Sequence, residues 1–147
     1  MKYVTRKTLF ILIFSALLLS ACTPAQIPVT GGKVHPSVVE PIEGSEFSRV
    51  VLTEKAVERL DLQTVPVEIR EMDSAHLAVP YAAVMYGLEG DTWVYTNPEP
   101  LVYIRQVIVI DYIDGDWVAL VEGPEVDTPV VTVGASLLYG AEVGVSK

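Results

Sequence analysis

The sequence contains a single cysteine, Cys22, and only two histidines, His35 and His76. One thiol cannot form a disulfide within the chain, so the fold must be stabilised by its apolar core. Neither histidine has another histidine or a cysteine nearby at metal-binding spacing, which predicts two surface histidines and no metal site. Positive charge is also scarce, with 10 Lys and Arg residues against 19 Asp and Glu residues. This acidic balance argues against nucleic-acid binding.

Motifs of catalysis are missing as well. The chain has no G-x-S-x-G turn, no glycine loop for a phosphate and no recognisable nucleophile–base pair. Asp111, Asp114 and Asp116 do not have the spacing of a calcium loop, and a hairpin turn is sufficient to explain Asp114. We therefore expect no enzyme and no cofactor.

The N-terminus has the pattern of a signal peptide. Lys2, Arg6 and Lys7 form a positive segment, and an apolar run follows from Leu9 to Leu19. This run is too short to span a bilayer comfortably, but it has the length of a signal-peptide core. Residues 1–21 are therefore predicted to be a leader that is not part of the folded domain.

The next residues, Leu19-Ser20-Ala21-Cys22, resemble the lipobox of bacterial lipoproteins. The resemblance implies that Cys22 receives a diacylglyceryl group and becomes the mature N-terminus. It also implies a lipid-anchored protein of the cell envelope, on the extracytoplasmic face of a bacterial membrane. The alternative is an ordinary secretory signal that ends near a cysteine. Removal of the three positive charges of the leader would change the net charge from −9 to −12.

Residues 22–48 are predicted to be a flexible linker. Four prolines interrupt this segment, Gly31-Gly32 and Gly44-Ser45 loosen it, and no periodic pattern is present. Val38-Val39 could nevertheless add an edge strand. The domain proper is expected to occupy residues 49–147.

This domain is expected to be mainly β, a small antiparallel β-roll or barrel-like unit with one short helix. Thr53 is a plausible N-cap, and Ala56, Val57 and Leu60 place an apolar stripe on the helix that follows. Pro66 argues that the strand expected over residues 62–72 lies at a sheet edge. Further strands are expected in residues 50–52, 75–86, 92–96 and 129–133.

The centre of the expected sheet is a hairpin over residues 101–121. Its first arm reads as one long strand, and Asp114-Gly115 is a preferred pair for a two-residue turn. With that turn, Tyr112 would face Trp117, Ile110 would face Ala119 and Ile108 would face Val121.

Three stretches together resemble bacterial periplasmic adaptor subunits, also called membrane fusion proteins, of resistance-nodulation-division efflux systems. They are Val51 to Leu60 continuing to Glu68, then Val79 to Val84 with Trp93-Val94-Tyr95, and finally Val107 to Asp116 with Val130 to Ala135. The resemblance implies the membrane-proximal β-domain of such an adaptor. Only eleven positions separate Glu68 from Val79, which leaves no room for the lipoyl-like domain and helical hairpin of a full adaptor.

The resulting expectation is a lipid-anchored accessory module of a transport system, which docks on an inner-membrane transporter without catalysis. Tyr81, Tyr86 and Tyr139 are the candidate contact residues, because they flank turns. The alternative is a free-standing envelope lipoprotein that binds a small ligand or has a structural role.

Overall fold

The structure is a computed structural model that describes residues 35–144. These residues form two antiparallel sheets and two helices, and neither sheet closes into a barrel. The predicted mainly β, antiparallel fold class is confirmed, but the number of helices is two instead of one. The predicted leader and Cys22 lie outside the described residues. Among the described helices, none has the length and apolar character needed to cross a bilayer.

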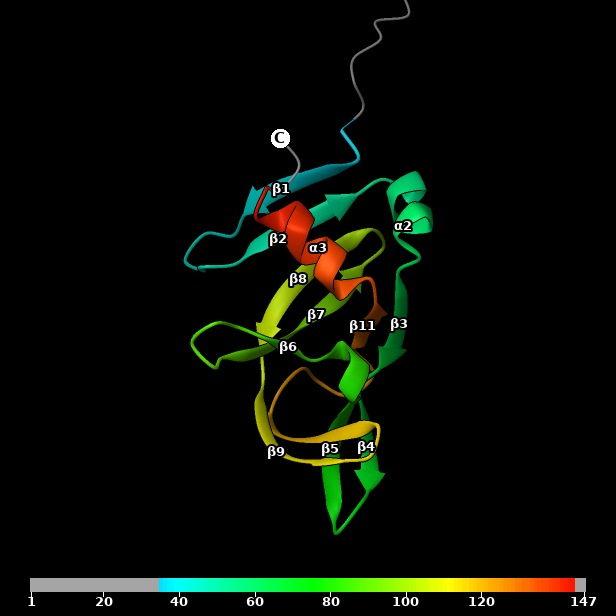
Figure 1. Cartoon of the computed structure of the whole chain (residues 1–147), viewed down its shortest axis with the longest axis vertical. Helices are drawn as coiled ribbons and strands as arrows, with labels where there is room; N and C mark the ends of the chain where they lie inside the picture. The colour runs from blue at the N-terminus through cyan, green and yellow to red at the C-terminus, as the bar shows by residue number, and fades with distance from the viewer. Residues whose placement is uncertain (1–34, 145–147) are drawn as a thin grey trace, which may run out of the picture. The chain divides into compact units, whose positions relative to one another are not determined.

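The larger sheet, sheet A, contains seven strands (Figure 1). Their order is β1 (Ser37–Pro41), β2 (Ser48–Leu52), β8 (Val102–Val107), β7 (Thr92–Glu99), β11 (Pro129–Val133) and β3 (Gln63–Pro66), with β6 (Met85–Tyr86) paired to β7. The edge strand expected at Val38-Val39 is therefore present, and it pairs along its whole length with β2. The end of the predicted linker thus belongs to the sheet. Pro66 lies on an edge strand, as predicted.

The smaller sheet, sheet B, has the order β4 (Glu68–Glu71), β5 (Ala75–Pro80), β10 (Trp117–Glu122) and β9 (Val109–Asp114). The chain moves between the two sheets after β3, β5, β8 and β10. Each sheet is thus built from segments that are distant in the sequence.

At two of these crossings between the sheets, one buried residue joins the two strands. Val67 joins β3 to β4; its N–H donates to the Thr128 carbonyl (2.9 Å), and its carbonyl accepts from the Asp127 N–H (2.8 Å). Ile108 joins β8 to β9; its N–H donates to the Thr92 carbonyl (3.0 Å), and its carbonyl accepts from Thr92 Oγ1 (2.8 Å). The predictions of one continuous strand in each region are therefore wrong. The strands break because the chain changes sheets, and every buried polar group at the break is satisfied.

The central strands of sheet A are buried on both faces. Along β7, Trp93 and Tyr95 point into one core cluster while Val94 points into the other, and Val131 and Val130 divide in the same way. One cluster lies between sheet A and the helices, and the second lies between sheet A and sheet B. Double-sided burial explains why these strands are apolar runs without polar alternation. Both clusters consist of residues within Val34–Lys147, so this unit contains its whole core.

Helix α2 (Glu54–Leu60) forms where the sequence predicts it. Thr53 is the N-cap, and its Oγ1 accepts from the Ala56 N–H at 3.2 Å. The helix ends at Asp61, which has a left-handed conformation with φ = 48°. Ala56 is buried against sheet A, and Val57 and Leu60 pack around it, as the apolar stripe indicated.

Helix α3 (Ala135–Glu142) was not predicted. Its local sequence gives little support, because Gly134 offers no capping side chain and Gly140 lies within the helix. Gly134 has φ = +86°, and a Cβ there would lie 2.3 Å from Leu62 Cδ2, so only glycine fits. The buried side chains of Ala135 and Leu138 attach the helix to the core. Tertiary packing, which the local pattern does not show, therefore forms this helix.

The β9–β10 hairpin has a register that differs from the predicted one. Its two-residue loop is Gly115-Asp116, so Trp117 pairs with Asp114 and Ala119 pairs with Tyr112. Glycine with φ = +57° occupies the first loop position, which is the arrangement of a type II′ turn. The partners expected for Tyr112, Ile110 and Ile108 were therefore wrong. The ladder then skips Asp111, which is the extra residue of a β-bulge.

We expect Thr92→Val to lower the free energy of unfolding by about 1 kcal/mol, because the isosteric change removes the bond to the buried Ile108 carbonyl. Thr132→Val is the matched control, since Thr132 Oγ1 makes a longer, exposed bond to Gln63. Urea denaturation of both variants measures the difference. If Thr92→Val and Thr132→Val had equal free energies of unfolding, the crossing at Ile108 would not depend on the hydrogen bond from Thr92.

Candidate functional site

Tyr81 and Tyr86, two of the three predicted contact residues, lie next to each other. Tyr81 begins the short 3-10 helix η1 (Tyr81–Ala83), and its N–H donates to the Asp116 carbonyl at 2.8 Å. Tyr86 ends β6 and pairs with Thr92. Desolvation, together with interaction with Tyr81, raises the pKa of Tyr86. Both rings are nevertheless largely exposed, at 45% and 54%.

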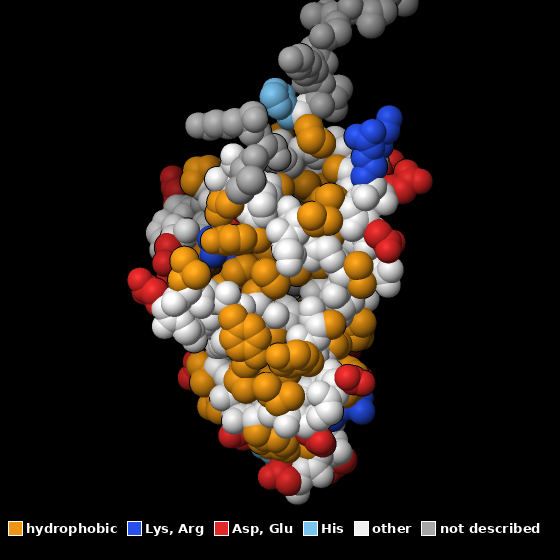
Figure 2. Space-filling model, in the orientation of Figure 1, with side chains coloured by type: hydrophobic (Ala, Val, Ile, Leu, Met, Phe, Trp, Pro, Cys, Tyr) orange, Lys and Arg blue, Asp and Glu red, His pale blue; other side chains and the backbone are white. Residues whose placement is uncertain are grey.

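Leu88 is a further exposed apolar residue, two positions after Tyr86 in the sequence. It lies in the loop of the β6–β7 hairpin and is fully exposed. The loop around it is ordered, because the Gly87 N–H donates to the Asp91 carbonyl at 2.8 Å and the Gly90 N–H donates to the Gly87 carbonyl at 3.3 Å. We call Tyr81, Tyr86 and Leu88 the hairpin surface. Figure 2 shows hydrophobic side chains gathered over this part of the molecule. Sequence analysis treated Leu88 only as part of a turn, although a large apolar residue between two glycines is a visible signal.

Tyr139, the third predicted contact residue, belongs to a different group of side chains. It lies on α3, and its ring centroid is 5.5 Å from that of Trp93. The Arg105 guanidinium lies 5.6 Å from the Tyr139 ring and 5.2 Å from the Trp93 ring. Tyr139 is 40% exposed. It therefore covers the aromatic packing of sheet A, whereas Tyr81 and Tyr86 form a pair of their own.

Beneath Tyr139 lies a buried ionic network that sequence analysis missed. Arg105 Nε and Nη2 donate to Glu142 Oε1 at 3.1 and 2.9 Å, and the Tyr95 hydroxyl donates to Glu142 Oε2 at 2.6 Å. The side chains of Arg105 and Glu142 are only 19% and 5% exposed. Burial and the Glu142 carboxylate raise the pKa of Tyr95 far above its usual value. The network fastens the end of α3 to strands β7 and β8 and leaves no free charge for chemistry.

One sequence signal pointed to this network. Arg105 alternates with Tyr103 and Val107 on one face of its strand, which makes it a charged residue between apolar neighbours. A buried arginine in such a position requires a carboxylate partner. The sequence did not show which acidic residue pairs with Arg105, because the helix that carries Glu142 was not predicted.

We expect Glu142→Ala to destabilise the fold by about 3 kcal/mol, because it leaves Arg105 buried without its partner. Glu99→Ala is the control: Glu99 pairs with Arg49 at 3.5 Å, but its side chain is 64% exposed. Such a surface pair contributes about 0–1 kcal/mol. Chemical denaturation compares the two variants, and similar losses would contradict a structural role specific to Glu142.

A second polar cluster surrounds His76 on sheet B. His76 Nε2 lies 2.8 Å from Asp73 Oδ1 and 2.9 Å from Ser74 Oγ, and the Tyr112 hydroxyl donates to Asp73. The bulge brings Asp111 to the same place, with its Oδ2 at 3.8 Å from His76 Nδ1. The cluster ties the β4–β5 hairpin to β9.

The geometry of this cluster does not match a catalytic or metal site. Asp73 and Ser74 share one nitrogen of His76, so a serine nucleophile has no base of its own. The 3.8 Å separation to Asp111 exceeds hydrogen-bond distance. The ring lies between the two carboxylates, so the three groups do not converge on one point. In the described residues no group of three or more potential metal ligands is found.

The hydrogen bond from Tyr112 is the largest cause that lowers the pKa of Asp73. In acid the unfolded chain therefore binds more protons than the folded chain does. The resulting stability is present above the usual Asp pKa of about 3.9 and is lost as the pH falls through the lowered value. We expect Tyr112→Phe to make the acid-side loss of stability shallower, as measured by unfolding between pH 5 and pH 2 at about unit intervals. Tyr139→Phe should keep the slope of the wild type; an equal change in both variants would refute the assignment to Asp73.

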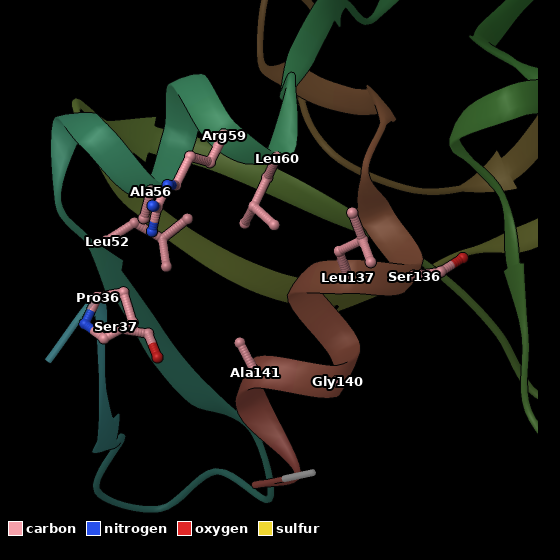
Figure 3. Close-up of a pocket in the computed structure, with 10 residues that line it drawn as sticks. All are labelled: Pro36, Ser37, Leu52, Ala56, Arg59, Leu60, Ser136, Leu137, Gly140 and Ala141. Atoms are coloured by element: carbon pink, nitrogen blue, oxygen red, sulfur yellow. The ribbon is translucent and has the colours of Figure 1, made fainter. Parts of the chain in front are cut away.

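A groove of about 390 Å³ lies between α2, α3 and strands β1 and β2 (Figure 3). Its wall is apolar, and in the close-up the side chains of Leu52, Leu60 and Leu137 point toward the common space while Ser136 points away from it. Pro36 closes the groove on the side of β1. The sequence analysis had no indication of this groove, because it depends on α3.

Comparison of the chain with protein-family models, with curated proteins and with solved structures found no match. The hairpin surface, the groove and the predicted lipid anchor are therefore the observations on which a functional proposal rests.

Proposed function

We propose that this chain is a lipid-anchored interaction module of a membrane transport system, and that it docks without catalysis on an integral membrane transporter. The observation that carries the proposal is the hairpin surface. Two adjacent tyrosines are exposed there, Tyr81 on η1 and Tyr86 on β6, and the fully exposed Leu88 lies in a hydrogen-bonded hairpin loop. Aromatic residues and preformed loops are typical of the centres of protein–protein interfaces.

The predicted anchor makes a small interface sufficient. Lipidation at Cys22 would confine the domain to a membrane surface, and this raises the effective concentration of any partner in the same membrane. A contact that is weak in free solution would then be occupied. The hydrogen-bonded β6–β7 loop supports the same conclusion, because a loop that is already folded loses less backbone entropy on binding than an unstructured one.

The resemblance to efflux adaptors supports a transporter as the partner. The mainly β fold agrees with the membrane-proximal domain that the resemblance implies. The chain between Glu68 and Val79 forms only the β4–β5 hairpin, so it carries nothing that reaches toward an outer-membrane channel. The proposed role is therefore accessory, at the transporter itself.

The alternative, a free-standing envelope lipoprotein that binds a small ligand, is supported by a different feature. The groove between α2 and α3 is apolar and has a volume within the range of about 300–1,000 Å³ that is typical of ligand sites. It involves neither Tyr81 nor Tyr86. The two functions can therefore be tested separately.

Photo-crosslinking in intact cells tests the docking proposal. We expect a photoreactive residue at Tyr86 or Leu88 to label an integral membrane transporter, identified by mass spectrometry of the linked peptides. Cys22→Ala should reduce this labelling by at least about tenfold, because effective concentration at the membrane is lost. The same assay places a photoreactive residue at Tyr139, which lies outside the hairpin surface.

Val126 is the control position, since its exposure is close to that of Tyr86 but it lies in the loop before β11. Labelling of the transporter from Val126 as strong as from Leu88 would show that the contact is not made by the hairpin surface. An unmodified Cys22 thiol in the wild type would refute the anchor. Recovery of a soluble protein or a cell-wall component, with no transporter, would favour the free-standing lipoprotein.

A further inference from the structure

The groove between α2 and α3 carries charge on one rim. Arg59 lines it, and a second hollow beside it shares Pro36, Ala56 and Arg59 and adds Lys55. Lys55 and Arg59 are four residues apart on α2, so they lie on the same side of the helix. The site therefore combines an apolar wall with two adjacent cations.

These two cations differ from the other positive charges of the described residues. Arg49 pairs with Glu99, Arg70 pairs with Glu68, and Arg105 pairs with Glu142. Among residues 35–144, Lys55 and Arg59 are the cations that form no ion pair. In a chain with net charge −9, two neighbouring cations without acidic partners are complementary to an anion.

We propose that the groove binds an anionic amphiphile with a single alkyl chain, of the fatty-acid class. The alkyl chain would lie against Leu52, Ala56, Leu60 and Leu137, and the carboxylate would be held by Lys55 and Arg59. The volume of about 390 Å³ is at the lower end of the range for ligand sites, which favours one chain over two. The inference is independent of docking on a transporter, because the groove and the hairpin surface share no residue.

Gly140 provides a sharp test of the apolar part. It lines the groove, and a Cβ placed there would meet no atom within 4 Å. A side chain can therefore begin at this position, and we expect Gly140→Leu to occupy the groove; leucine is also favoured over glycine in a helix. Gly140→Ala is the matched control, since it improves the helix in the same way but leaves most of the space. Thermal unfolding of both variants verifies that they are folded.

The binding experiment uses dodecanoate and residues 34–147, which contain the whole core, with isothermal titration calorimetry as the readout. We expect saturable binding of one dodecanoate to the wild type and to Gly140→Ala, and at least about tenfold weaker binding to Gly140→Leu. Equal binding by Gly140→Leu, or no binding to the wild type, would overturn the proposal.

The charge part is tested with Lys55→Gln and Arg59→Gln. Each should weaken dodecanoate binding by about tenfold, because a charge-assisted bond is lost. Arg70→Gln, a change on sheet B, should have no effect. Dodecanol should bind more weakly than dodecanoate and should not respond to Arg59→Gln. If dodecanol binds as tightly as dodecanoate, the proposed anionic class is wrong.

A longer chain tests whether the groove is open in the mature protein. Residues 22–147 with Cys22→Ala should bind dodecanoate as tightly as residues 34–147 do. Loss of binding in the longer chain would show that residues 22–33 occupy the groove, and it would replace the proposed ligand by a segment of the chain itself.

Discussion

The burial of the central strands of sheet A on both faces is the constraint on which the rest of the structure depends. Alternate residues of β7 and β11 enter two different cores, so the sheet needs a cover on each side. Sheet B covers one face, and α2 and α3 cover the other. A chain of this length can supply both covers only by crossing between layers repeatedly, which places residues such as Val67 and Ile108 in the interior. Their backbone groups must find partners outside a regular ladder, and Thr128, Asp127 and Thr92 provide them.

The sequence predicted those elements whose cause is local. Thr53 caps α2 with its own side chain, and Pro66 excludes its strand from the middle of a sheet. Elements that depend on distant partners were missed or displaced. Helix α3 has no cap and an internal glycine, and it is stable only because Leu138 is buried and Glu142 meets Arg105. The hairpin loop lies one residue later than predicted because Gly115 takes the first loop position, so Tyr112 pairs with Ala119 instead of Trp117, and a bulge then absorbs Asp111. No period-two pattern contains that information.

The candidate sites show the same difference between features with a local cause and features that depend on distant residues. Tyr81 and Tyr86 were chosen as candidate contact residues because tyrosines beside turns are a local signal. The structure places the two side chains together at the surface. Tyr139 carries the same signal, but its ring packs on Trp93 as part of the cover of sheet A. The groove was invisible to sequence reasoning, since one of its walls is α3. Local patterns thus identified exposed residues, whereas the concave site required the tertiary arrangement of two short helices.

The distribution of positive charge links these observations. Arg105 forms a buried ion pair with Glu142 that holds α3 in position. Arg49 and Arg70 form ion pairs with Glu99 and Glu68 at the surface. Among the described residues, the cations without an acidic neighbour at bonding distance are Lys55 and Arg59 of α2, and Arg59 lines the groove that α3 completes. The ion pair between Arg105 and Glu142 therefore has a consequence beyond stability. By fastening α3 to β7 and β8, it holds the helix that forms one wall of the groove. A loosened α3 would leave both cations in place but would remove the apolar wall opposite them, so the charge and the shape of the site have separate structural origins.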